Sequence, residues 1–98
     1  MITIVKIKLL GHTKSFTGSA ELEIVLAEPK SLKQFLAELS EKYPKLRVVV
    51  EEVLTFHGEY LLLLNDIDVG VYGDLDKVVI RDGDTLTVVP IVHGGAGS

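Results

Sequence analysis

The chain contains no cysteine, which excludes disulfides, thiolate metal sites and a cysteine nucleophile of its own. It also lacks a long hydrophobic run, because the longest purely apolar stretch, Tyr60–Leu64, is far too short to cross a membrane. The N-terminal residues show neither a basic start nor a small-residue cleavage site. We therefore expect no signal peptide, no membrane association and a cytoplasmic protein.

Basic residues are few and dispersed. Lys and Arg number 10 against 14 Asp and Glu, and the formal net charge is −4. Binding to nucleic acid requires clustered Lys and Arg, so we expect no nucleic-acid partner. All six aspartates fall between Asp66 and Asp84. This crowding is typical of turns and caps, and an acidic docking face for a basic partner is the alternative.

The remaining composition is that of one globular domain. The hydrophobic fraction of 47% is sufficient for a globular core. A length of 98 residues allows one such core, since two separate cores would each be too small. We predict a domain over residues 1–92. The glycine-rich residues 93–98 have nothing to bury and are expected to form a mobile tail.

Alternating hydrophobicity predicts the strands. Residues 1–9 alternate, with Thr3, Val5, Ile7 and Leu9 on a mostly apolar face, and residues 21–26 alternate again after a loop over residues 11–20 that is rich in Gly, Ser and Thr. These two strands are expected to pair as an antiparallel hairpin. Two later strands are predicted at Tyr60–Leu64 and at Thr85–Ile91.

A helix is predicted after Pro29. Ser31 and Gln34 have the spacing of a capping box, and Pro44 stops the helix. An apolar stripe at helical spacing lies between them: Leu32, Phe35, Leu36, Leu39 and Tyr43. Leu46–Phe56 is left open as an irregular connection or a short helix, and Asp68–Lys77 is expected to be a loop.

This order of elements predicts an α+β fold. A helix that follows a hairpin must cover one face of the sheet, and the last strand can then lie parallel to the first. We therefore expect a ubiquitin-like β-grasp, with a mixed sheet of four to five strands and one main helix packed on one face.

The C-terminal part of the sequence resembles a known family. A turn at Asp82-Gly83-Asp84 is followed by one apolar strand and then by His93-Gly94-Gly95. This pattern resembles the MoaD and ThiS sulfur carriers and the small archaeal modifiers. The closing His-Gly-Gly is particularly similar to the ubiquitin-related modifier, which acts both as sulfur carrier and as protein tag.

The resemblance implies that the carboxylate of Gly95 is the reactive group and Gly94 its flexible approach. A ubiquitin-activating-type enzyme would adenylate Gly95 with ATP, so this chain itself is expected to bind no cofactor. The adenylate would become a thiocarboxylate, or would be transferred to a lysine of a target protein. Two successive glycines suit this role independently of the family, because a chain without Cβ atoms is thin and adaptable.

The chain departs from this pattern after Gly95. Ala96-Gly97-Ser98 follow, so the free carboxylate of the printed sequence is on Ser98. A processing protease that trims a precursor, a cloning addition, or a tail that is never activated would each account for them.

No other motif indicates chemistry. Asp66, Asp68 and Gly70 do not have the spacing of a calcium loop. The three histidines, His12, His57 and His93, are isolated and lack the spacing of zinc ligands, so no metal site is expected. No nucleophile elbow and no phosphate-binding loop is present. We therefore predict that the protein is not an enzyme.

A partner-binding surface is predicted beside the tail. Leu86 and Val88 should face the helix, which leaves Val89 and Ile91 on the open face of the sheet. Ile4 is expected to join them, and His93 could contact an activating enzyme. The alternative is that these are ordinary surface residues or that a loop covers them.

Three functions are consistent with these observations. The first is a sulfur carrier for molybdopterin synthesis or tRNA thiolation, which would deliver sulfur to an acceptor enzyme subunit. The second is a protein modifier conjugated through Gly95 to lysines. The third is a passive interaction module.

Overall fold

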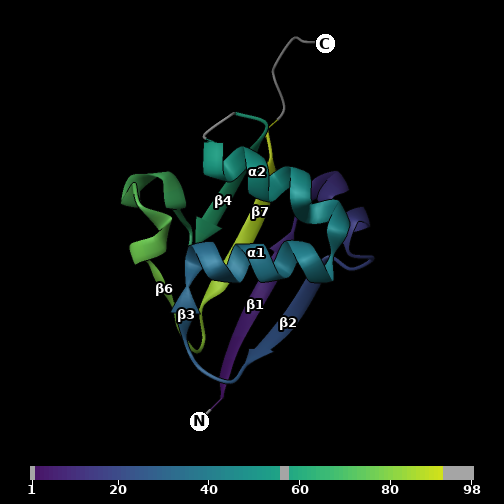
Figure 1. Ribbon diagram of the computed structural model, residues 1–98. Helices are drawn as coiled ribbons and strands as arrows, with labels where there is room; N and C mark the ends of the chain where they lie inside the picture. The colour runs from purple at the N-terminus through teal and green to yellow at the C-terminus, as the bar shows by residue number, and fades with distance from the viewer. Residues whose placement is uncertain (1, 56–57, 92–98) are drawn as a thin grey trace.

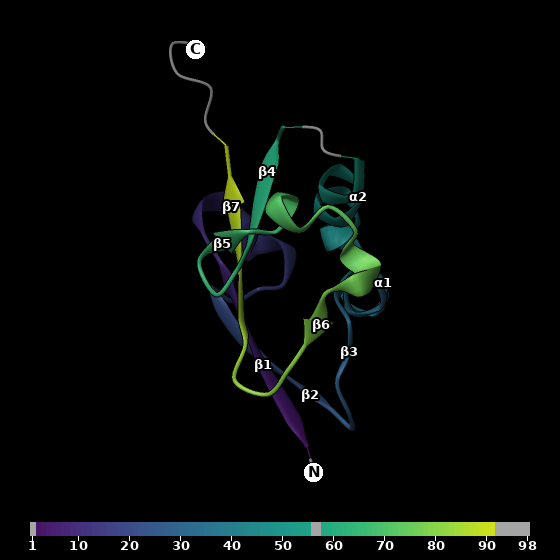
Figure 2. The ribbon, with the colours of Figure 1, turned by 90° about the vertical axis from the view of Figure 1, so that its left-hand side faces the viewer.

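A computed structural model describes residues 2–55 and 58–91, with the two α-helices in one layer on one side of a mixed sheet (Figures 1 and 2). The elements in chain order are β1 (Thr3–Leu9), η1 (Gly11–Phe16), β2 (Glu21–Leu26), β3 (Lys30–Ser31), α1 (Leu32–Lys42), η2 (Pro44–Leu46), α2 (Arg47–Thr55), β4 (Tyr60–Leu64), β5 (Ile67–Asp68), η3 (Val69–Tyr72), η4 (Leu75–Lys77), β6 (Val79–Ile80) and β7 (Thr85–Pro90), where η denotes a 3₁₀ helix. The predicted tail over residues 93–98 lies outside the described residues.

The sheet has the order β2-β1-β7-β4-β5, and β3 pairs separately with β6. β1 and β2 form the expected antiparallel hairpin, and β7 lies parallel to β1, with Ile7 opposite Leu86. β7 is therefore the central strand, held by β1 on one side and by β4 on the other. This arrangement confirms the predicted β-grasp.

α1 begins and ends as the sequence indicates. Ser31 Oγ accepts a hydrogen bond of 3.1 Å from the amide of Gln34, and the helix stops before Pro44. The return half of the predicted capping box, from the Ser31 amide to the Gln34 side chain, is not found among the bonds of the described residues, and Gln34 Nε2 donates to Glu38 at 3.3 Å.

The open segment after Pro44 is a helix, α2. Val49, Val50 and Val53 are buried at helical spacing, while Val48 and Leu54 remain exposed. Three consecutive valines favour extended chain by propensity, but the burial of one stripe against the sheet outweighs that weak preference. The predicted loops are also more ordered than expected, since η1, η3 and η4 lie within them.

One apolar core lies between the sheet and the helices. The helix-facing residues of β1 and β7 form its sheet side. Leu86 and Val88 are buried there, as predicted. The full cluster is Val5, Ile7, Leu9, Leu26, Leu32, Phe35, Leu36, Leu39, Leu46, Val49, Val50, Val53, Leu62, Leu64, Val69, Leu75, Ile80, Leu86 and Val88.

The aspartates mainly serve the local backbone. Asp68 and Asp74 cap short helices by accepting from the amides of Gly70 and Asp76, at 2.8 and 3.0 Å. Asp82 and Asp84 hold the turn before β7, as described below. These contacts support the turn-and-cap interpretation. Among the described residues, no helix is long and apolar enough to span a membrane.

Candidate functional site

The described chain ends at Ile91, directly after the central strand. Pro90, the last residue of β7, lies opposite Tyr60, and the amide of Ile91 donates to the carbonyl oxygen of Glu59 at 3.0 Å. The central strand is thus paired as far as Ile91. His93, Gly94 and Gly95, the predicted reactive end, lie outside the described residues.

The turn before β7 fixes the register of that strand. Gly83 has φ +87°, and its amide donates to the carbonyl oxygen of Ile4 at 2.9 Å. Asp82 Oδ1 accepts from the amide of Ile4 at 2.8 Å, and Asp84 Oδ2 accepts from the amide of Arg81 at 2.7 Å. The Asp82-Gly83-Asp84 motif therefore has a structural role at the end of β7 opposite the tail.

The same contacts correct the expected position of Ile4. Its backbone bonds to Asp82 and Gly83, whereas Val89 lies six residues after Gly83 along β7. At about 3.3 Å per residue this is roughly 20 Å. Ile4 lies opposite Val25, so the prediction that Ile4 joins Val89 and Ile91 is wrong. The error arose because alternation predicts which face a residue is on, but not its level along the sheet.

The residue that does accompany Val89 comes from β4. Leu61 lies directly opposite Val89, and both are half-buried on the side of the sheet away from the helices. Leu63, the next open-face residue of β4, is also half-buried. We call Leu61, Val89 and Ile91 the tail-root surface. Leu61 escaped the sequence analysis because a uniform run of leucines has no alternation that reveals its two faces.

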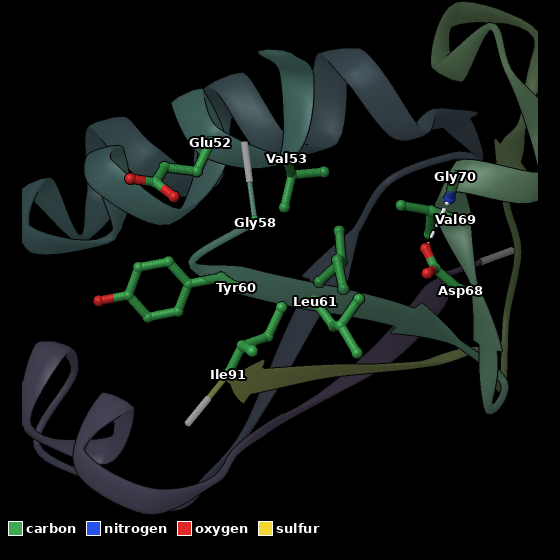
Figure 3. Close-up of a pocket in the computed structure, with 10 residues that line it drawn as sticks. Glu52, Val53, Gly58, Tyr60, Leu61, Asp68, Val69, Gly70 and Ile91 are labelled. Carbon is green, nitrogen blue, oxygen red and sulfur yellow. Dashed lines mark hydrogen bonds between the residues drawn. The ribbon is translucent and has the colours of Figure 1, made fainter. Parts of the chain in front are cut away.

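A hollow of about 180 Å³ adjoins this surface (Figure 3). Its lining residues come from α2, from Gly58 and β4, from the segment Asp68–Gly70 and from Ile91. Val53 points from α2 toward β4. The two acidic groups at its rim bind backbone, because Glu52 accepts from the amide of Glu59 at 3.2 Å and Asp68 from that of Gly70. The hollow therefore suits an apolar side chain better than a phosphate.

An aromatic cluster supports the same end of the sheet. His12 Nε2 lies 3.3 Å from the hydroxyl of Tyr60, and Phe16 packs edge-on against both rings, with centroid distances of 5.7 and 6.4 Å. Gly11, with φ +55°, sits so close to Pro90 that a Cβ would lie 3.0 Å from the proline Cγ. His12 and Tyr60 are 48 residues apart, so no sequence signal could have joined them.

The other histidines are not accounted for by the structure, since His57 and His93 lie outside the described residues. Within residues 2–55 and 58–91, no group of three His, Cys, Asp or Glu side chains could hold a metal ion.

Comparison with solved structures shows the same fold in several proteins. The small archaeal modifier protein 1 from Methanosarcina acetivorans superposes with a TM-score of 0.70 at 24% identity, over 97% of this chain and 99% of that one. Urm1 from Trypanosoma brucei superposes with a TM-score of 0.71 at 24% identity, over 96% of this chain and 97% of that one. One chain of the complex of subunits 1 and 2 of molybdopterin-converting factor from Helicobacter pylori 26695 superposes with a TM-score of 0.59 at 22% identity, over 95% of this chain and 100% of that one.

No curated protein sequence matches the chain significantly. The profile of the ThiS family, in contrast, matches residues 7–95, which is nearly the whole sequence and includes Gly94 and Gly95. Proteins of this kind are small β-grasp carriers or modifiers and are not themselves enzymes. The chain belongs to the ThiS family.

Proposed function

We propose that this chain is a sulfur carrier whose active group is the carboxylate of Gly95. The observation that supports it best is the anchoring of β7, the strand that leads to the diglycine. Its start is fixed by the Asp82–Asp84 turn, and its end is paired to Glu59 and packed near Gly11. A rigid strand that ends at Pro90, five residues before Gly95, provides a fixed point of attachment for the segment that carries this carboxylate.

The proposed chemistry takes place on a partner enzyme. The Gly95 carboxylate attacks the α-phosphorus of ATP, which forms an acyl-adenylate and releases pyrophosphate. A sulfur donor at the oxidation level of sulfide then displaces AMP and leaves a thiocarboxylate, which carries sulfur to its acceptor. In a chain that carries Ala96 after Gly95, as in the printed sequence, the Gly95–Ala96 bond must first be hydrolysed. We place this reaction in the cytoplasm, where ATP is available.

The tail-root surface is the proposed docking site for the activating enzyme and for the sulfur acceptor. Leu61, Val89 and Ile91 offer apolar contacts next to the start of the tail, and the hollow between α2 and β4 can receive a side chain of the partner. The complex of subunits 1 and 2 of molybdopterin-converting factor from Helicobacter pylori 26695, one chain of which has this fold, is a precedent for such an assembly.

Intact-mass analysis of the protein from its native cells tests the proposal. We expect a species that ends at Gly95 and carries sulfur in place of one carboxylate oxygen. A Gly95→Ala variant expressed in the same cells is the control and should lack that species. A protein found only with Ala96-Gly97-Ser98 still attached would contradict the proposal and favour a passive interaction module.

The second candidate function is conjugation to other proteins. It is favoured by the similarity to a small archaeal modifier protein and to Urm1 over almost the whole chain. Here the ε-amine of a target lysine, rather than sulfur, displaces AMP and forms an isopeptide bond. Lysine peptides branched with the C-terminal residues of this chain would identify it in protease digests of whole cells.

A further inference from the structure

The outer edge of β2 is unpaired in the described structure. β2 is the last strand of the sheet on its side, and β1 is its sole partner. The amide of Leu9 donates to the carbonyl oxygen of Ala20, which sets the alternation of the antiparallel ladder. By that alternation Leu22 and Ile24 bond to β1, whereas the backbones of Glu21, Glu23 and Val25 point outward.

A groove of about 220 Å³ runs between this edge and α1. Buried Phe35 and Leu39 from the helix and half-buried Ile24 from the strand form its apolar part, with Lys42 at its rim. Figure 1 shows α1 crossing the sheet toward β2, and the groove is lined by residues of these two elements. An added strand could bond to the outward backbone groups while inserting alternate side chains here.

The charges on the edge define the partner. On the open face, Glu21 pairs with Lys6 at 3.5 Å, and Glu23 has no cationic partner among the described residues. Val25, 62% exposed, continues this row. An incoming strand therefore needs basic residues over Glu21 and Glu23 and apolar residues on the groove side.

A second copy of the chain does not meet this requirement. An antiparallel pairing of two β2 strands centred on Glu23 would place the two Glu23 carboxylates opposite each other. Centring the pair on Val25 would leave hardly any paired length, because β2 ends at Leu26 and Pro29 lacks an amide hydrogen.

We propose that the groove between β2 and α1 binds an extended segment of another protein in which basic and apolar residues alternate, added as a strand to β2. The site is separate from the tail-root surface, which lies on β4 and β7 beyond β1. Binding there requires neither ATP nor Gly95, so the inference stands independently of the proposed function.

The test uses the full chain labelled with nitrogen-15 and two blocked peptides, Ile-Lys-Ile-Lys-Ile and its matched control Ile-Glu-Ile-Glu-Ile. In NMR titrations we expect the lysine peptide to shift the amides of Glu21, Glu23 and Val25 saturably. The glutamate peptide should bind at least tenfold more weakly. Equal binding of both peptides, or shifts confined to the tail-root surface, would overturn the proposal.

Two variants separate strand addition from nonspecific charge attraction. Val25→Pro removes a backbone N–H that points away from β1, so it breaks no bond to β1. This substitution should lower the affinity for the lysine peptide at least tenfold. Glu23→Lys should lower the affinity for the lysine peptide at least threefold and raise the affinity for the glutamate peptide. Should Val25→Pro unfold, Glu23→Lys alone decides. Val89→Asp, on another strand, should leave the affinity unchanged.

Wild-type affinity in both variants would refute the site. Sedimentation velocity over a range of protein concentrations provides the remaining test. A concentration-dependent dimer that is lost in Glu23→Lys or Val25→Pro would assign the edge to a second copy of the chain and would overturn the proposal.

Discussion

The side chain of Asn65 bridges the turn after β4 to the start of β7: its Oδ1 accepts from the amide of Thr85, and its Nδ2 donates to Asp84 Oδ1, both at 3.0 Å. Asn65 itself has φ +50°, a left-handed conformation that asparagine tolerates better than most residues. One residue thus closes the hairpin between β4 and β5 and positions the central strand.

Asn65→Ala should therefore destabilise the domain by about 2 kcal/mol, because it adds left-handed strain and removes two hydrogen bonds. Urea denaturation would measure the change in the free energy of unfolding. Asn65→Gly is the matched control, since it relieves the strain but still lacks both bonds. Its free energy of unfolding should fall by less than that of Asn65→Ala. Equal losses in the two variants would show that backbone strain contributes nothing.

Gly11→Ala should destabilise the domain more than Gly18→Ala does. Both glycines have positive φ, +55° and +86°, so both alanines carry backbone strain of about 1–2 kcal/mol. The alanine at position 11 would also press on Pro90, whereas nothing lies within 4 Å at position 18. Thermal unfolding of the two variants isolates the contact at the tail root. A larger loss for Gly18→Ala would contradict the packing described there.

Val89→Asp should lower activation of a chain that ends at Gly95. A carboxylate in the centre of an apolar contact must be desolvated, so we expect a loss of about tenfold or more in pyrophosphate exchange catalysed by the activating enzyme. Ile4→Asp is the control, because Ile4 lies on the same side of the sheet but at its opposite end. Equal losses from both substitutions would mean that the partner covers the whole face.

Ser31→Ala should destabilise the domain by about 1 kcal/mol through loss of the N-cap of α1. Gln34→Ala should change stability by less than about 0.5 kcal/mol, since its side chain does not return to the backbone of Ser31. Chemical denaturation of both variants compares the two halves of the motif. A large effect of Gln34→Ala would indicate a reciprocal bond in solution.

Apart from the two-residue strands β3, β5 and β6, the sequence alone was sufficient for the strands, for α1 and for the order that leads to a β-grasp. These features depend on short-range rules, namely alternation with period two, helical spacing and the caps at Ser31 and Pro44. The diglycine motif is equally local. Propensity left the outcome open only where it opposed burial, as at Val48–Val50, where the extended preference of valine yielded to the packing of one helical stripe.

Tertiary structure decided what lies beside the tail. The sequence placed Val89 on the open face, but the parallel register of β1 and β7 put Ile4 at the far end and the antiparallel register of β4 put Leu61 opposite Val89. The contact between His12 and Tyr60 likewise exists only because η1 folds over the end of β7. Register between strands distant in sequence depends on how the whole core packs, so no local pattern could determine these neighbours.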